Sequence, residues 1–355
     1  MHTDTTAPTN PTTPRWDILT GSSRLRAFLR FVLAAAWLFA AIRIAEAVRD
    51  WVGDDLGQVS YQIILLVLLL FGFGFMGLAF DRQQQPLKAM GFVRRPGIGR
   101  EWAVGAFIGW GMVVLAVLPS ALAGDLEVSF WTRPRAFWLF ALSLVTFAVG
   151  TLAEEVAFRG YPFQRLIQAI GPTAATVLMV VFFAAVHLQG SDATLSSTLV
   201  TMLAGVIYSV AYLRTRALWL PWGLHFAWKI SMGVLFGLPV GGALNFGTII
   251  QSNAVGPHWL TGGVYGPEAA FITVLVLLAG LMVLVRATRE YAWHYTFEPI
   301  VPAGYPMDAQ PPAAHVAMEA QANVAVPLVQ ILPNTPQSVS ANELVRPEDL
   351  QRPTE

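Results

Sequence analysis

The run YQIILLVLLLFGFGFMGLAF, at residues 61–80, contains no charged side chain. A helix needs about 20 apolar residues to cross the hydrocarbon core of a bilayer, which is roughly 30 Å thick. The whole chain has a matching composition, because 55% of its 355 residues are hydrophobic and only 12% are charged. A soluble domain carries about 25% charged residues. The chain is therefore expected to be an integral membrane protein.

Similar apolar stretches lie on both sides of this run. The expected spans are residues 26–48, 60–80, 102–123, 136–158, 172–189, 195–213, 217–238 and 269–287. Helices are expected because a bilayer offers no water to satisfy the backbone groups of an open strand. The sequence thus predicts an all-α, polytopic membrane protein with about eight transmembrane helices.

Charge and cysteine content exclude several classes of function. The formal net charge is zero, so no basic field attracts nucleic acid. There is no Walker motif and no glycine fingerprint after a strand, so no nucleotide or flavin is expected. The chain has no cysteine, which excludes disulfides, cysteine nucleophiles and thiolate zinc sites. A metal ion would need His and carboxylate ligands.

Lys and Arg are concentrated in alternate loops. The rich side includes the N-terminal flank, the loop after the second expected span, and the exits of the fourth, sixth and eighth spans. By the positive-inside rule, both termini are expected in the cytoplasm of a cell-membrane protein. Composition divides the chain into a disordered N-terminus at 1–24, a transmembrane domain at 25–288 and a mostly disordered tail at 289–355.

Ionisable side chains within the spans are the candidates for chemistry, since each costs at least about 2.5–3.5 kcal/mol to insert. The stretch TLAEEVAFRGY contains Glu154, Glu155 and Arg159. Glu155 and Arg159 are four residues apart and share a helix face, whereas Glu154 points about 140° away. Glu155 is therefore expected to pair with the arginine, which leaves Glu154 as the candidate general base. The alternative is that both glutamates only cap the helix or snorkel to the membrane surface.

Two further stretches place a histidine inside a span. FFAAVHL sets Phe183 and His187 one helical turn apart, and PWGLHFAWK does the same for His225 and Lys229. A single histidine among aliphatic residues is usually a satisfied core residue, but two of them favour a site. If the helices converge, one glutamate and two histidines could activate a water molecule and stabilise an oxyanion. The same atoms could instead hold zinc.

Three short motifs occur in order along the chain: E-E-x-x-x-R from Glu154, F-x-x-x-H ending at His187, and the histidine of H-x-x-x-N at His225. Together they resemble the motifs of the CAAX protease and bacteriocin-processing family of intramembrane endopeptidases. The likeness covers about residues 87–286 and includes TGGVYGPE at 261–268. It implies a CAAX-protease-like helical bundle and a glutamic or metallo-endopeptidase.

The resemblance also implies roles for individual residues. Glu154 would activate the attacking water, His187 and His225 would position it or stabilise the tetrahedral intermediate, and Glu155 with Arg159 would support the site. Phe183 and Lys229 would lie beside them. The sequence requires no cofactor, with zinc on His187, His225 and Glu154 as the alternative. The implied partners are membrane lipid and a peptide or membrane-protein substrate, lipidated in some members.

Two features depart from this pattern. Lys229 stands where the family has Asn, and a cation beside two imidazoles disfavours a divalent metal. It therefore favours water activated by glutamate, or a pseudoenzyme. The simple span boundaries also place Glu154 and His187 about 22 Å apart along the bilayer normal. They meet only if the fourth helix continues deeper, or if the polar turn at 189–197 enters a protein-lined cavity.

Three functions follow from these observations. The first is an intramembrane endopeptidase. The second is a non-proteolytic membrane scaffold or immunity-type protein of the same fold, which Lys229 favours and the intact E-E-x-x-x-R motif opposes. The third is a proton-coupled transporter, because buried Glu, His and Lys also build proton relays. A transporter would be expected to show repeat symmetry, and the halves of this sequence show none.

Overall fold

A computed structural model describes residues 21–188, 192–243 and 249–294. All of these residues belong to one compact unit, Met1–Gln310. The predicted disorder at 1–24 and 289–355 falls almost entirely outside the described residues. Within the predicted tail, the described part forms one short helix, α12 (Arg289–His294).

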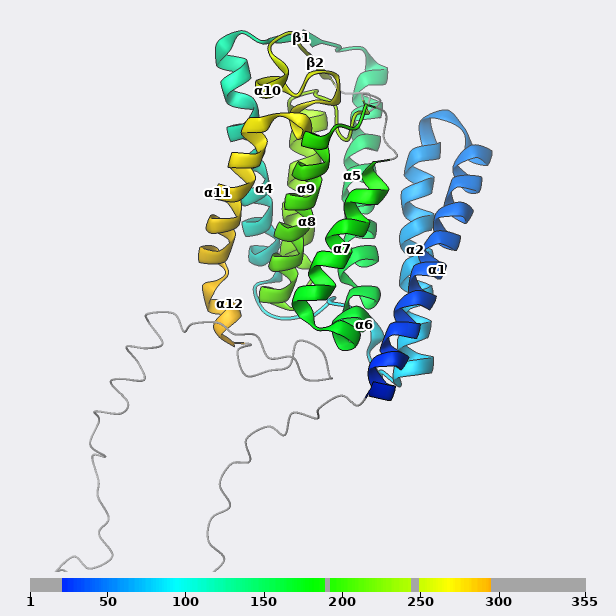
Figure 1. The fold of residues 1–355 in the computed structure, drawn as a ribbon. Coiled ribbons are helices and arrows are strands. Elements are labelled where there is room, and N and C mark those ends of the chain that lie inside the picture. Colours follow the sequence, from blue (N-terminus) through cyan, green and yellow to red (C-terminus); the bar gives the residue numbers. More distant parts are fainter. Residues whose placement is uncertain (1–20, 189–191, 244–248, 295–355) are drawn as a thin grey trace, which may run out of the picture. The chain divides into compact units, whose positions relative to one another are not determined.

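Helices make up nearly all of the described chain (Figure 1). The long ones are α1 (Gly21–Val52), α2 (Asp54–Asp81), α4 (Ile98–Ala123), α5 (Pro134–Arg159) and α8 (Leu195–Thr215). Those of intermediate length are α6 (Tyr161–Ile170), α7 (Pro172–His187), α9 (Trp219–Ile230) and α11 (Phe271–Ala287). The short ones are α3 (Pro86–Ala89), α10 (His258–Thr261), the π-helical turn η1 (Ser231–Leu235) and the 3-10 turns η2 (Gly263–Tyr265) and η3 (Pro267–Ala269).

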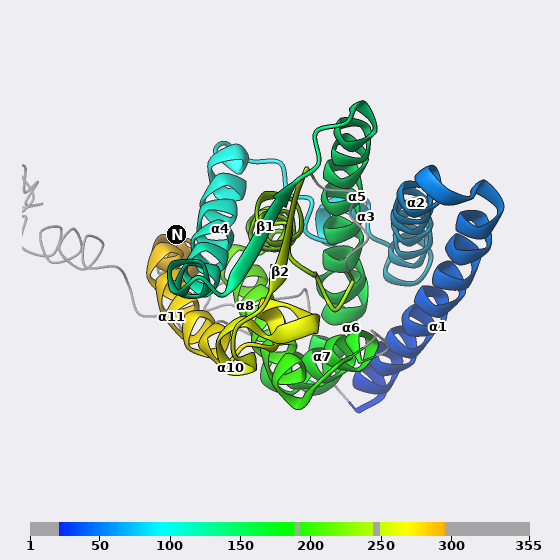
Figure 2. The same cartoon turned by 90° about the horizontal axis from the view of Figure 1, so that it is seen from above.

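Two strands, β1 (Leu126–Phe130) and β2 (Ile250–Ala254), pair antiparallel, with Leu126 opposite Ala254. They lie with α10 at one end of the helices, and α6 and α12 lie at the other end (Figure 1). Seen along the helices, α1 and α2 form a pair beside α5 (Figure 2). In the contacts between elements, α1 packs on α2 and α6, and α2 packs on α5.

The all-α, polytopic membrane fold is confirmed, but the count of eight spans is not. Each predicted span overlaps a helix, yet within residues 21–188, 192–243 and 249–294 only five helical runs are both long and apolar enough to cross a membrane. Two more, Pro172–His187 and Phe271–Ala287, are shorter apolar helices. The seventh predicted span holds the 12 residues of α9 followed by the π-helical turn.

Glycines fix the position of α9 against α4. A Cβ atom on Gly105 would lie 2.2 Å from the Leu220 carbonyl oxygen, and one on Gly109 would lie 2.3 Å from that of Leu224. A Cβ atom on Gly223 of α9 would likewise lie 2.2 Å from the Trp102 carbonyl oxygen of α4. Small residues at such positions allow two membrane helices to approach backbone to backbone. This contact holds the helix that carries His225.

The helix α6 explains how Glu154 and His187 meet. After α5 ends, the chain continues through α6, and Pro134–Ile170 forms one apolar run of 37 residues. Only then does α7 turn back, starting beside α6 (Figure 1). Between Glu154 and the start of α7 the chain contains the rest of α5 and all of α6, and His187 Nε2 ends 3.9 Å from Glu154 Oε2. The expected separation was wrong because it began the return at the end of α5.

Candidate active site

A buried ion pair forms the back of the candidate site. Arg159 Nη1 lies 3.4 Å from Glu155 Oε1, and the exposed fractions of the two side chains are 2% and 0%. Arg159 also donates a hydrogen bond to the Gly205 carbonyl oxygen of α8, at 3.1 Å. Its guanidinium lies 4.9 Å from the centre of the Phe183 ring and 5.2 Å from that of Tyr208. Snorkelling is therefore the wrong interpretation for this pair, since neither side chain reaches the surface.

Two contacts hold the His225 ring in place: a hydrogen bond to a carboxylate and a stacked aromatic ring. Its Nδ1 lies 2.8 Å from Glu155 Oε1, and its ring stacks on Tyr208 with centroids 4.4 Å apart. An ionised carboxylate can only accept a hydrogen bond, so Nδ1 carries the proton. In the neutral ring, Nε2 is then an acceptor. That atom lies 3.5 Å from Glu154 Oε2.

His187 is oriented by Phe183, one turn earlier in α7. Its Nδ1 lies 2.8 Å from the Phe183 carbonyl oxygen, and the two rings are 4.4 Å apart. A carbonyl oxygen also only accepts, so Nδ1 is again the donor and Nε2 the acceptor. His187 Nε2 lies 3.9 Å from Glu154 Oε2.

Three acceptor atoms thus face one point: Glu154 Oε2, His225 Nε2 and His187 Nε2. Glu154 Oε2 and His225 Nε2 are buried and have no hydrogen-bond partner among the described residues. Buried polar atoms without partners are uncommon and often have a catalytic role. A molecule with two hydrogens to donate, such as water, would satisfy two of the three acceptors.

A cavity connects Glu154 and His187 to α1 and α2. It has a volume of about 210 Å³, and its walls include the polar side chains of Tyr61 and Gln62. A second cavity of about 260 Å³ has an apolar lining. The two share five residues: Leu38, Ile42, Ala157, Phe158 and Val186. The Glu154 side chain is 30% exposed, so it can be reached from this side.

Lys229 lies one turn after His225 and is close enough to interact electrostatically with Glu154 and Glu268. In the part of the chain that the structure describes, its ammonium makes no hydrogen bond or ion pair. Glu268 is buried and accepts from Trp228 Nε1 at 2.8 Å and from the Gly241 backbone N–H at 2.6 Å. The site thus contains a cation that interacts electrostatically with two carboxylates.

Sequence reasoning missed two residues near the site, Glu268 and Tyr208. Glu268 could have been recognised from the sequence, because it is the single acidic residue in the otherwise uncharged TGGVYGPE stretch. Tyr208 carried none, since nothing in the sequence indicates that its ring faces His225.

The structure brings the three suggested zinc ligands together but does not arrange them as a metal site. Within the described ranges, no group of three or more His, Cys, Asp or Glu side chains is placed to hold a metal ion. The neighbouring Lys229 also opposes a divalent cation electrostatically.

The segment that contains the site matches the model of a known family. Residues 136–231 match the family model described as type II CAAX prenyl endopeptidase Rce1-like. The matched segment contains every residue that the sequence motifs singled out, from Glu154 to Lys229. No curated protein and no solved structure matches the chain. The family match supports membership of the chain in the CAAX protease and bacteriocin-processing family.

Proposed function

We propose that the protein is an intramembrane endopeptidase in which Glu154 activates the attacking water. The observation that supports this most strongly is the convergence of Glu154 Oε2 with Nε2 of His225 at 3.5 Å and of His187 at 3.9 Å. A carboxylate beside two acceptor nitrogens, on a cavity within an apolar helical protein, suits proton abstraction from water.

The proposed reaction begins with water bound between Glu154 and His187. Glu154 takes one proton while the water oxygen bonds to the carbon of the scissile carbonyl. The proton then passes to the leaving nitrogen as the C–N bond breaks. The products are a carboxylate and an amine, and no further reactant is needed.

The two histidines are expected to act differently because their Nδ1 partners differ. His187 Nδ1 faces a neutral carbonyl, so its ring remains neutral and Nε2 accepts from the water. His225 Nδ1 faces the Glu155 carboxylate, which would stabilise a protonated ring. The proton that Glu154 takes from water could move to His225 Nε2, 3.5 Å away, and this atom would then donate to the oxyanion of the tetrahedral intermediate before the proton passes to the leaving nitrogen.

The cavities support a substrate that carries an apolar anchor. The polar cavity at Glu154 adjoins an apolar one along α1 and α7, and the two share part of their walls. A peptide or membrane protein, lipidated or not, could place its anchor in the apolar part and its scissile bond at Glu154. We therefore infer cleavage near the membrane surface.

Lys229 favours one second candidate, a scaffold or immunity-type protein of the same fold without turnover. Its charge interacts with Glu154 and would hold that carboxylate ionised. A glutamate stabilised in this way is a weaker base.

Purified full-length protein in proteoliposomes, incubated with a library of peptides and lipoproteins, tests the proposal. Glu154→Gln should lower cleavage by about 10²–10⁴-fold, because it removes the base and keeps the side-chain volume. Its melting temperature should stay unchanged. Glu127→Gln, an exposed position on β1, is the control and should retain activity. Full activity of Glu154→Gln would refute the mechanism, and no cleavage by the unmodified protein would favour the scaffold.

We also propose that both termini are cytoplasmic. The Arg-containing helices α6 and α12 lie at one end of the described helices, and the β1–β2 pair lies at the other (Figure 1). The even number of crossings expected from the sequence is compatible with this arrangement. A cysteine placed at Ser338 should resist impermeant reagents added to intact cells, and labelling from outside would reverse the orientation.

A further inference from the structure

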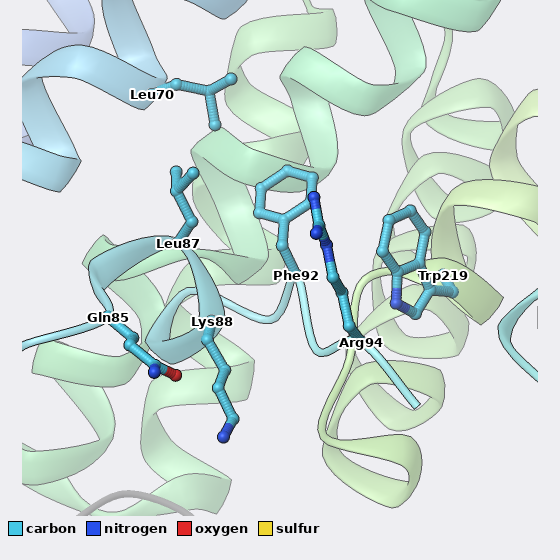
Figure 3. Close-up of a pocket in the computed structure, with 7 residues that line it drawn as sticks. All are labelled: Leu70, Gln85, Leu87, Lys88, Phe92, Arg94 and Trp219. Carbon is cyan, nitrogen blue, oxygen red and sulfur yellow. The ribbon is translucent and has the colours of Figure 1, made fainter. Parts of the chain in front are cut away.

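Another cavity lies away from Glu154, where the chain leaves α2 and enters α4 (Figure 3). Its volume is about 470 Å³. Its lining residues are Leu70, Gln85, Leu87, Lys88, Phe92, Arg94 and Trp219. None of them lines the cavity at Glu154.

The wall formed by the linker between α3 and α4 is fixed to the helices. The Leu218 backbone N–H donates to the Gly91 carbonyl oxygen at 3.0 Å, and Trp219 Nε1 donates to that of Val93 at 2.7 Å. Gly91 has φ +111°, and a Cβ there would lie 2.9 Å from Leu218 Cγ. The Phe92 ring also packs against Trp219, with centroids 5.8 Å apart. These contacts therefore fix the position of this wall of the cavity.

The lining changes from apolar beside α2 to polar beyond the end of that helix. Leu70 lies 11 residues before the end of α2, which is about 16 Å inside the apolar helix. Gln85 and Lys88 follow the end of that helix. In Figure 3 the Gln85 amide and the Lys88 ammonium lie on one side of the cavity, and Leu70 and Leu87 lie on the other. An amphiphile would match this gradient.

The lining carries two positive charges without a counter-charge: the Lys88 ammonium on the polar side, and the Arg94 guanidinium beside the Phe92 ring in Figure 3. Lys88 and Arg94 are exposed, and within the described residues neither makes a hydrogen bond or ion pair. No acidic side chain lines the cavity. The neighbouring Arg95 differs, because Glu101 accepts from its guanidinium at 2.5 Å. Lys88 and Arg94 therefore remain available for an anion.

We propose that this cavity binds an anionic phospholipid. Lys88 and Arg94 are both exposed, so their side chains would turn toward the headgroup phosphate and hold it, since guanidinium and ammonium groups are the usual donors to phosphate at membrane surfaces. An acyl chain would lie against Leu70, Leu87 and Phe92. Trp219 suits this boundary because indole rings concentrate at membrane interfaces. The apolar half of the cavity is the reason to assign a lipid and not free phosphate. This site does not depend on the proposed protease activity.

Lipid exchange into the full-length protein tests the proposal, with retained phosphatidylglycerol and phosphatidylcholine measured by native mass spectrometry. Phosphatidylglycerol should be retained preferentially. Lys88→Gln with Arg94→Gln should weaken its retention at least about fivefold, since each basic residue contributes to headgroup binding. Arg82→Gln with Arg100→Gln removes two exposed charges nearby that do not line the cavity and should have little effect.

A second variant tests the apolar half. Leu87→Trp would fill part of the cavity without changing its charge and should also weaken retention. Equal losses in the two double variants would mean a general surface charge effect and would overturn the proposal. Equal retention of the two lipids would overturn it as well. Displacement of the lipid by millimolar inorganic phosphate would show an anion site in its place.

Discussion

Two carboxylates, Asp81 at the end of α2 and Glu154 in α5, lie in contrasting surroundings. Asp81 Oδ1 accepts hydrogen bonds from Arg30 and Arg165, each at 2.6 Å. Glu154 Oε2 contacts no guanidinium, and its neighbours are two imidazole nitrogens at 3.5 and 3.9 Å. Direct pairing with two cations fixes Asp81 as a link between α1, α2 and α6. The looser neighbours of Glu154 leave it free to exchange a proton.

The contrast separates a buried charge that stabilises the fold from one that is available for catalysis. A carboxylate paired directly with cations is costly to disturb, because the cations lose their only compensation. A carboxylate facing neutral rings and a cavity can change its protonation without that cost. Stability and activity should therefore respond to different substitutions.

The largest expected effect on stability comes from Asp81→Asn. It would leave the Arg165 side chain, which is 2% exposed, without a counter-charge and should cost about 3–5 kcal/mol. Thermal unfolding in detergent measures this cost. Arg30→Gln is the matched control and should cost less, because Arg30 is 31% exposed. If Glu154→Gln destabilised the protein as much as Asp81→Asn, the distinction between the two carboxylates would fail.

Glu155→Gln should affect both stability and activity. It leaves Arg159 with the Gly205 carbonyl oxygen but without a charged partner, at an expected cost of about 2–3 kcal/mol. It also removes the charge that would stabilise a protonated His225, so turnover should fall in the surviving folded protein. Unfolding curves and cleavage assays on the same preparation separate the two effects. Normal stability together with normal turnover would contradict the role of the pair.

Much of this contrast could be predicted from the sequence, and the rest depends on long-range packing. The Glu155–Arg159 pair follows from helical spacing, and the two histidines stood out as ionisable residues inside apolar spans. The break between α5 and α6 also had a signal, since Gly160 and Pro162 are typical of one helix ending and another beginning. The contact between Glu155 and His225 joins residues 70 positions apart, and no local pattern predicts it.

A smaller effect is expected at Tyr208, whose ring stacks on His225. Tyr208→Leu removes an aromatic contact worth about 0.5–1.5 kcal/mol and should lower turnover severalfold by loosening the imidazole. Tyr208→Phe keeps the ring and should restore most of the activity. If both variants lost activity equally, the hydroxyl and not the stack would be the important group.

The smallest expected effect is also the one that tests the departure from the family motif. Lys229 interacts with Glu154, and its positive charge makes that carboxylate harder to protonate. Lys229→Asn keeps a polar side chain and removes the charge. Cleavage should then rise by about twofold, which corresponds to roughly 0.4 kcal/mol, and zinc should bind more tightly in titration calorimetry. Arg100→Asn removes an exposed positive charge that lines neither the cavity at Glu154 nor the proposed lipid cavity and should leave turnover unchanged. Unchanged or lower turnover of Lys229→Asn across several substrates, with no gain in zinc affinity, would mean that the lysine takes part in a different mechanism. In that case the ammonium would serve the oxyanion, because it is a cation that interacts with Glu154 and makes no hydrogen bond or ion pair within the described chain.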